Sequence, residues 1–136
     1  MLGMFKVSNR VHDGLVFMTI LAKYYDTDKV VPISVLEKLG DISAGYMEEI
    51  IVSLRKNGLV KGVRGQGGGY RLGKPPAKIR VNDVIGALGD VISLGLHEQG
   101  GRCPFGEKCY SRGFFKNLEG AVKNTLLKYT LKELIK

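Results

Sequence analysis

The chain of 136 residues is 44% hydrophobic and 25% charged, which is the composition of about one folded domain rather than of a disordered segment. No apolar run approaches the ~18 residues that cross a membrane, and the N-terminus lacks the features of a secretory signal, so we expect a cytoplasmic protein with no membrane partner. Lys and Arg number 21 against 13 Asp and Glu, and the resulting net charge of +8 suits a polyanionic partner.

The first half of the sequence predicts three helices. Apolar side chains recur at three- and four-residue spacing over residues 11–25 and predict the first. A second, short helix is expected to open with a capping box formed by Ser34 and Glu37 and to close at Gly40. A third is expected after its cap, Ser43, with one apolar stripe facing the core: Met47, Ile50, Ile51 and Leu54. Two short helices joined by a tight turn are typical of a helix-turn-helix.

A basic hairpin is predicted directly after the third helix. Two short strands, over residues 59–63 and 70–72, are joined by a connection with glycine at four of the five positions from 65 to 69. Glycine supplies the positive φ of tight hairpin turns and permits a close approach of the backbone to another surface. From Leu54 to Arg80 the chain has eight Lys or Arg and no Asp or Glu. A helix followed by such a hairpin is what a winged helix-turn-helix presents to DNA, with the helix in the major groove and the wing along the phosphates.

The residues expected to contact double-stranded DNA lie on the polar face of the third helix and in the hairpin. On the helix they are Ser43, Tyr46, Arg55 and Lys56. In the hairpin they are Arg64, Gln66, Gly67 and Gly68, with the backbone N–H groups from Gly67 to Gly69 near phosphates. Arg64 at the wing tip also has the reach to enter a narrow minor groove, which attracts guanidinium groups.

The C-terminal part of the chain predicts a helix, a loop and a long helix. The first helix is expected over residues 82–88, whereas the glycine-rich stretch 95–113, which holds both cysteines and one of the two histidines, has no helix or strand periodicity. From Phe114 onward an apolar stripe returns at helical spacing: Phe115, Leu118, Val122, Leu126 and Tyr129. So much apolar surface on a last helix is most simply buried against a second copy of the chain, which predicts a homodimer.

The expected fold class is therefore mainly α with a small β-wing: a winged helix-turn-helix plus a long C-terminal dimerisation helix. Residues 1–80 are expected to form the DNA-binding domain, and residues 81–136 to hold the loop and the dimerisation helix as one compact unit. The sequence contains no Ser-His-Asp arrangement, metalloprotease motif or P-loop, so an enzyme is the less favoured class.

Three stretches of the sequence resemble the Rrf-type winged-helix transcription regulators. They are ISAGYMEEIIVSL (residues 42–54), RKNGLVKGVRGQGGGY (55–70) and YRLGKPPAKIRVNDVI (70–85). A cysteine-containing loop before a last long helix extends the resemblance from about Lys6 to Leu134. A RKNGLV run followed by RGxGGGY is not a general feature of winged helices. The resemblance implies a homodimeric transcription factor, in which many members control DNA affinity through a bound iron–sulfur cluster.

The resemblance also implies a ligand set. Cluster-binding members of the family carry three cysteines spaced C-x5-C-x5-C, and this chain has H-x5-C-x5-C, formed by His97, Cys103 and Cys109. An ungapped alignment of the N-terminus places His12 at the position of the variable fourth ligand. Two thiolates and two imidazoles fit a [2Fe–2S] cluster better than a [4Fe–4S] cluster. The implied cofactor is therefore a [2Fe–2S] cluster held by Cys103, Cys109, His97 and His12.

Other uses of these residues stay open. The missing first cysteine also fits a cluster-free branch of the family, in which Cys103 and Cys109 are free thiols or a redox pair beside Arg102 and Lys108. Two Cys and two His also suit tetrahedral zinc, although the short cysteine spacing usual in zinc sites is absent.

The sequence thus predicts a homodimeric DNA-binding regulator that senses redox state, iron–sulfur status or nitric oxide through its cluster. The alternative is a cluster-free winged-helix regulator of the same family, controlled by a partner protein or by thiol oxidation.

Overall fold

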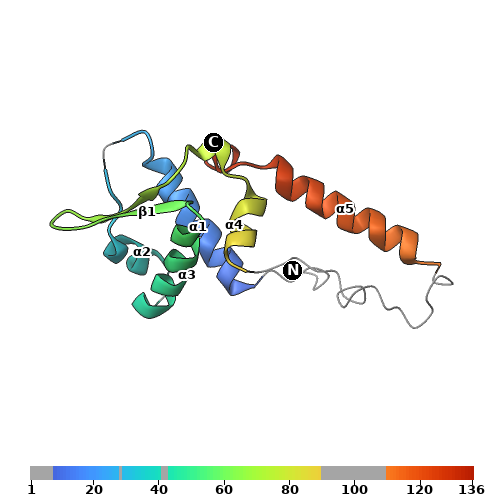
Figure 1. Ribbon diagram of the computed structural model, residues 1–136, viewed down its shortest axis with the longest axis horizontal. Helices are drawn as coiled ribbons and strands as arrows, with labels where there is room; N and C mark the ends of the chain where they lie inside the picture. Colours follow the sequence, from blue (N-terminus) through green and yellow to red (C-terminus); the bar gives the residue numbers. More distant parts are fainter. Residues whose placement is uncertain (1–7, 28, 41–42, 90–109) are drawn as a thin grey trace.

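The computed structural model describes residues 8–27, 29–40, 43–89 and 110–136. Helices dominate this part of the chain, and its sheet is a two-stranded antiparallel hairpin (Figure 1). In chain order the elements are α1 (Asn9–Lys23), α2 (Ile33–Gly40), α3 (Ala44–Lys56), β1 (Val60–Val63), β2 (Gly69–Leu72), the short 3₁₀ helix η1 (Pro76–Lys78), α4 (Val81–Ala87), α5 (Arg112–Lys128) and α6 (Leu131–Leu134). The expected helical fold with a small β-wing is confirmed. Among the described residues no helix is both long and apolar enough to cross a membrane.

α1 lies at the centre of the core and begins two residues before its predicted start. Ser8 explains the earlier start, because its hydroxyl oxygen accepts the N–H of Val11 (3.2 Å) and so caps the helix. Gly14, a weak helix former, is buried where α1 crosses α4. A Cβ atom at Gly14 would lie 2.6 Å from Cδ1 of Leu88, so the glycine permits a close approach of the two helices.

α2 and α3 form the expected helix-turn-helix. α2 begins at Ile33, because the Pro32 carbonyl already accepts an N–H of the first turn (3.1 Å). Ser34 therefore lies inside the helix, and its predicted capping role is wrong. Ser43 does cap α3, since its hydroxyl oxygen accepts the N–H of Tyr46 (3.3 Å). The apolar stripe predicted for α3 is confirmed as core, with relative exposures of 2% or less: Met47, Ile50, Ile51 and Leu54.

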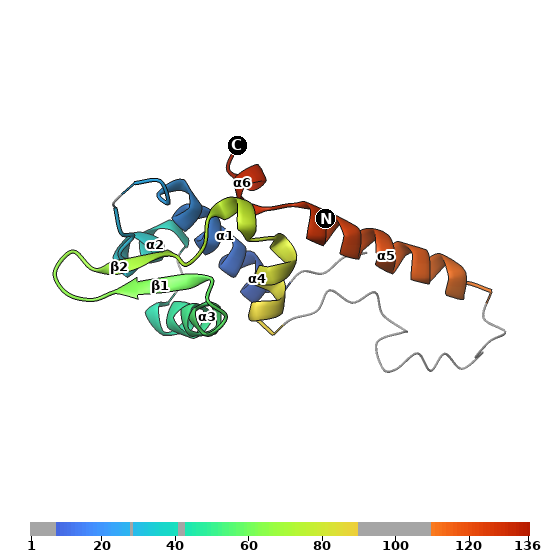
Figure 2. The ribbon, with the colours of Figure 1, turned by 45° about the horizontal axis from the view of Figure 1, so that its top comes forward.

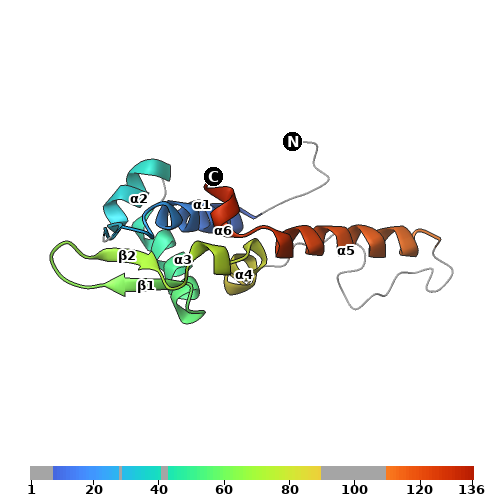
Figure 3. The same cartoon turned by 90° about the horizontal axis from the view of Figure 1, so that it is seen from above.

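The wing pairs β1 with β2 in antiparallel register, with Val60 opposite Leu72. Its base is joined to the connection between α1 and α2, because Val31 and Tyr70 exchange two backbone hydrogen bonds (3.0 and 2.9 Å). Gly69 lies against this junction, where a Cβ atom would be 2.4 Å from the Val31 carbonyl oxygen. From this base the hairpin tip projects beyond α2 and α3 (Figures 2 and 3).

The residues after α5 return to the winged-helix core. The helix predicted over residues 82–88 is confirmed as α4, and its Val84 is fully buried. Leu131, at the start of α6, is also fully buried, and its N–H donates to the Ile79 carbonyl (2.9 Å). A backbone bridge joins Arg80 to Thr130 beside it. The core of the winged helix therefore includes Leu131, a residue that follows α5 in the sequence.

α5 projects from the body, and only its C-terminal end lies beside the other helices (Figures 1 and 3). It begins at Arg112, inside the stretch expected to be loop, and residues 90–109 lie outside the described residues. Four residues of its predicted apolar stripe are half-buried in one copy of the chain: Phe115, Leu118, Val122 and Leu126. The fifth, Tyr129, follows the helix as its C-cap and is 42% exposed. Phe114 is 61% exposed, so one copy alone leaves apolar surface on this helix uncovered.

Candidate nucleic-acid interface

α3 turns one side away from the core, and this side is the candidate surface for the major groove. The residues exposed at its cap and along it are Ser43, Gly45, Glu48, Glu49, Val52, Arg55 and Lys56. Three of the four residues predicted for contact on this helix are among them. The fourth, Tyr46, is half-buried and packs against the core, so less of its side chain faces outward than the sequence suggested.

Sequence reasoning missed two residues at the centre of this exposed face, Glu48 and Val52. They lie one helical turn apart, on the side opposite the buried Ile50. A carboxylate accepts a hydrogen bond from the cytosine amino group, and an apolar side chain suits the thymine methyl group, so both residues carry base-reading chemistry. The sequence could have indicated both residues, because the helical spacing that predicts the buried stripe of α3 also predicts which residues lie on the opposite face.

The wing tip is built from residues 64–68, one residue fewer than the sequence predicted, because Gly69 already belongs to β2. Gly65 and Gly67 have φ of +96° and +76°, a region that favours glycine. Arg64, Gln66 and Gly67 are exposed there. The N–H of Gly68, which was expected to face a phosphate, donates instead to the Gly65 carbonyl (2.9 Å). Gly68 therefore closes the turn, and the exposed side chains of the tip remain for external contacts.

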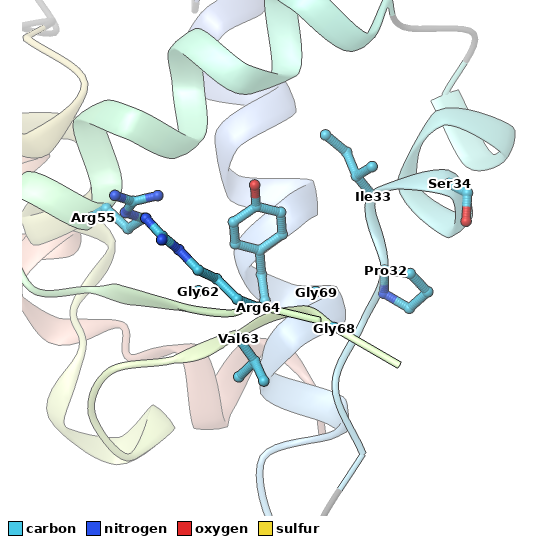
Figure 4. A pocket seen from close by; sticks show the side chains of 10 residues that line it. Pro32, Ile33, Ser34, Arg55, Gly62, Val63, Arg64, Gly68 and Gly69 are labelled. Atoms are coloured by element: carbon cyan, nitrogen blue, oxygen red, sulfur yellow. The ribbon is translucent and has the colours of Figure 1, made fainter. Parts of the chain in front are cut away.

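A cleft lies between the end of α3, the wing and the start of α2 (Figure 4). Its lining residues are Pro32, Ile33, Ser34, Arg55, Gly62, Val63, Arg64, Gly68, Gly69 and Tyr70. Arg64 extends across the cleft toward Arg55, and no acidic side chain is among the lining residues. In the part of the chain that the structure describes, neither guanidinium takes part in a salt bridge. Two unneutralised guanidinium groups that converge on one cleft suit an anion such as a phosphate.

The other arginine of the wing is used inside the fold. Arg71 on β2 is half-buried, and its Nη2 donates to the Thr27 carbonyl (3.1 Å). This bond ties β2 to the turn after α1. The basic stretch from residue 55 to 80 therefore divides into residues that hold the wing in place and residues, such as Arg55 and Arg64, that face outward.

Of the four candidate cluster ligands, the structure describes His12. His97, Cys103 and Cys109 lie outside the described residues. His12 stands in the first turns of α1 with its side chain 72% exposed, and its Nδ1 lies 3.2 Å from Oδ1 of Asp13. Among the described residues no group of three His, Cys, Asp or Glu is placed to hold a metal. His12 is thus accessible, with Nε2 as the ring nitrogen left for a further partner.

Comparisons with known proteins cover nearly the whole chain. Residues 7–136 match the Rrf2 family, described as iron-dependent transcriptional regulators. The HTH-type transcriptional regulator IscR of Escherichia coli is 37% identical over 105 residues, which are 77% of this chain and 65% of IscR, so the matched region spans less than two thirds of that relative.

Solved structures show the same fold. The structure of CymR, the global cysteine regulator of B. subtilis, superposes with a TM-score of 0.81 at 31% identity and covers 97% of both chains. That of T. potens IscR superposes with a TM-score of 0.75 at 28% identity, over 96% of this chain and 85% of the other. The relatives are regulators and not enzymes, and this chain, matched from residue 7 to residue 136, belongs to the Rrf2 family of transcriptional regulators.

Proposed function

We propose that the protein binds duplex DNA as a homodimer to regulate transcription, with α3 in the major groove and the wing along the phosphates. The observation that carries this proposal is the convergence of Arg55 and Arg64 on an acid-free cleft between α3 and the wing. Residues 1–80 would bind the DNA. Residues 81–136 would supply the sensing loop and, through the half-buried stripe of α5, the dimer contact.

Binding measured against salt tests this proposal. The probe is a duplex selected from a randomised pool with the wild-type protein, and a dimer that contacts roughly 6–10 phosphates should lose about 10³-fold or more in affinity between about 50 and 200 mM salt. Arg64→Ala should weaken binding by about 1–3 kcal/mol. Lys132→Ala is the matched control, because it removes the same charge from an exposed position of α6, a helix that lies away from α3 (Figures 1 and 2). Unchanged affinity in Arg64→Ala removes the wing from the proposal.

We further propose that a [2Fe–2S] cluster is held by Cys103, Cys109, His97 and His12, with His12 supplied by the partner copy. The family's description as iron-dependent supports this proposal. The contact of His12 Nδ1 with Asp13 supports it too, because metal-binding histidines usually place their second nitrogen against a carboxylate. When bound, the cluster supplies one-electron redox chemistry. His12 and Asp13 would hold and orient it from the first turns of α1.

Iron and acid-labile sulfide in anaerobically prepared protein test the ligand set. Cys103→Ala and Cys109→Ala should each abolish both, and His97→Ala should leave a weaker, more labile centre. His97→Cys should retain a cluster at a lower reduction potential, because thiolate donates more charge to iron than imidazole does. Wild-type protein that takes up no iron after reconstitution contradicts the proposal.

The second candidate is a cluster-free regulator controlled by a partner protein or by thiol oxidation. The close superposition on CymR, described as a global cysteine regulator, favours it. The two candidates differ in a simple observation. A brown protein with charge-transfer bands supports the cluster, whereas a colourless protein whose DNA affinity responds to oxidants, and loses that response in Cys103→Ala, supports the thiol switch.

A further inference from the structure

Arg10 joins three helices that are far apart in the sequence. It lies in the first turn of α1, where its Nη2 donates to the hydroxyl oxygen of Ser53 on α3 (2.8 Å) and its Nε donates to the Leu88 carbonyl at the end of α4 (3.0 Å). α1, α3 and α4 pack against one another, so one side chain spans both contacts (Figures 1 and 2). Both bonds are partly buried.

The bond to Leu88 gives a hydrogen-bond donor to a backbone carbonyl at the end of α4. Leu88 is the C-cap of α4, and the carbonyls of a last helical turn have no partner within their own helix. A cation there is also favoured by the helix dipole. The side chain of Leu88 packs against Gly14, one turn after Arg10 on α1. α1 therefore holds the end of α4 through a backbone bond and through a close side-chain contact.

The bond to Ser53 joins Arg10 to α3 and would resist rotation of this helix about its own axis. Ser53 lies at the edge of the exposed face, next to Val52, and Arg10 lines a surface depression together with Glu48, Glu49, Val52 and Ser53. Guanidinium is a planar fork with fixed donor directions, so two bonds made by one fork fix the relative positions of the two acceptors. A small rotation of α3 would break the bond to Ser53 or pull on the end of α4.

We propose that Arg10 is a positioning residue for sequence recognition, which sets the orientation of α3 relative to α1 and α4. The inference rests on the proposed function, since it assigns a role to Arg10 in reading DNA. In this proposal Arg10 uses its two bonds inside the fold and acts through Glu48 and Val52, the candidate base-reading residues. In the sequence, α4 precedes the stretch that contains the candidate ligands His97, Cys103 and Cys109. Through its bond to Leu88, Arg10 therefore also connects the helix before that stretch to α3.

The test compares selected and random-sequence duplexes of equal length for wild type, Arg10→Ala, Ser53→Ala and the double variant, well below the lowest melting temperature. Arg10→Ala should lose about tenfold in affinity for the selected duplex, because charge-assisted bonds are lost. Its affinity for the random duplex and its salt dependence should stay unchanged, because no phosphate contact is removed. Ser53→Ala should show the same loss, and the double variant no more than either single one.

Arg10→Lys and Lys23→Ala complete the series. Arg10→Lys should recover only part of the selectivity, since an ammonium group lacks the fork, and Lys23→Ala, an exposed charge at the other end of α1, should behave as wild type. Equal losses on both duplexes with a reduced salt slope would make Arg10 a phosphate contact and overturn the inference. So would additive losses in the double variant, or full selectivity in Arg10→Ala. A wild type that prefers no sequence would instead overturn the proposed function.

Discussion

Gly69→Ala should destabilise the protein at the base of the wing. The new Cβ atom would lie 2.4 Å from the carbonyl oxygen of Val31 and 2.8 Å from Cα of Pro32, both of them backbone atoms that have no other rotamer to adopt. Relief requires the wing to move away from the α1–α2 connection, which breaks the two hydrogen bonds between Val31 and Tyr70. Each such bond contributes about 1 kcal/mol, so we expect a loss of roughly 1–3 kcal/mol.

Thermal unfolding followed by circular dichroism measures this loss. For a chain of this size, ~1 kcal/mol corresponds to roughly 3–5 °C, so Gly69→Ala should melt roughly 3–15 °C below wild type. Gly62→Ala on the facing strand is the matched control, because its Cβ would lie no closer than 3.8 Å, to Cε1 of Tyr70. A gain of about 0.5 kcal/mol is expected there, since alanine loses less backbone entropy than glycine. Equal melting temperatures for the two variants would show that the wing base is not fixed by this junction.

Three further predictions concern the core and the dimer. Leu131→Ala should lose about 2–5 kcal/mol in chemical denaturation because its side chain is fully buried, whereas Leu134→Ala on the same short helix, 44% exposed, should lose under about 1 kcal/mol. Gly86→Ala, which meets open space in α4, should raise the melting temperature by roughly 2–4 °C, while Gly14→Ala should lower it through its clash with buried Leu88. Val122→Asp should give monomers or insoluble protein in light scattering, and a soluble, intact dimer would disprove the α5 interface.

Local features of the sequence predicted the helix-turn-helix and the wing well. The spacing of Met47, Ile50 and Leu54 fixes which side of α3 is buried, and the cap at Ser43 fixes where the helix starts, because both depend on residues within one or two turns. The start of α2 was misplaced by two residues, since Ser34 is a residue type that often caps helices but the Pro32 carbonyl begins the turn earlier.

Contacts between distant residues were beyond the reach of this reasoning. Arg10 finds its partners 43 and 78 residues away, and nothing local distinguishes it from any exposed arginine at the start of a helix. The burial of Leu131 could not be predicted for the same reason, because a short apolar run after a long helix does not indicate which core it packs into. The DNA contacts predicted from charge are similarly incomplete, since charge points to Arg55 and Arg64 but passes over an exposed valine such as Val52.

The burial of Leu131 sets an order of events during synthesis. Residues 8–89 contain the whole proposed DNA-reading surface, yet its core lacks a side chain until residue 131 has been added. At about 5–20 residues per second, the 42 residues from 90 to 131 take a ribosome roughly 2–8 s. During this interval the core beneath the proposed reading surface lacks the Leu131 side chain, so the fold reaches its full stability only after α5 has been made. A nascent chain therefore acquires the proposed means of pairing with a second copy before its hold on DNA can be complete.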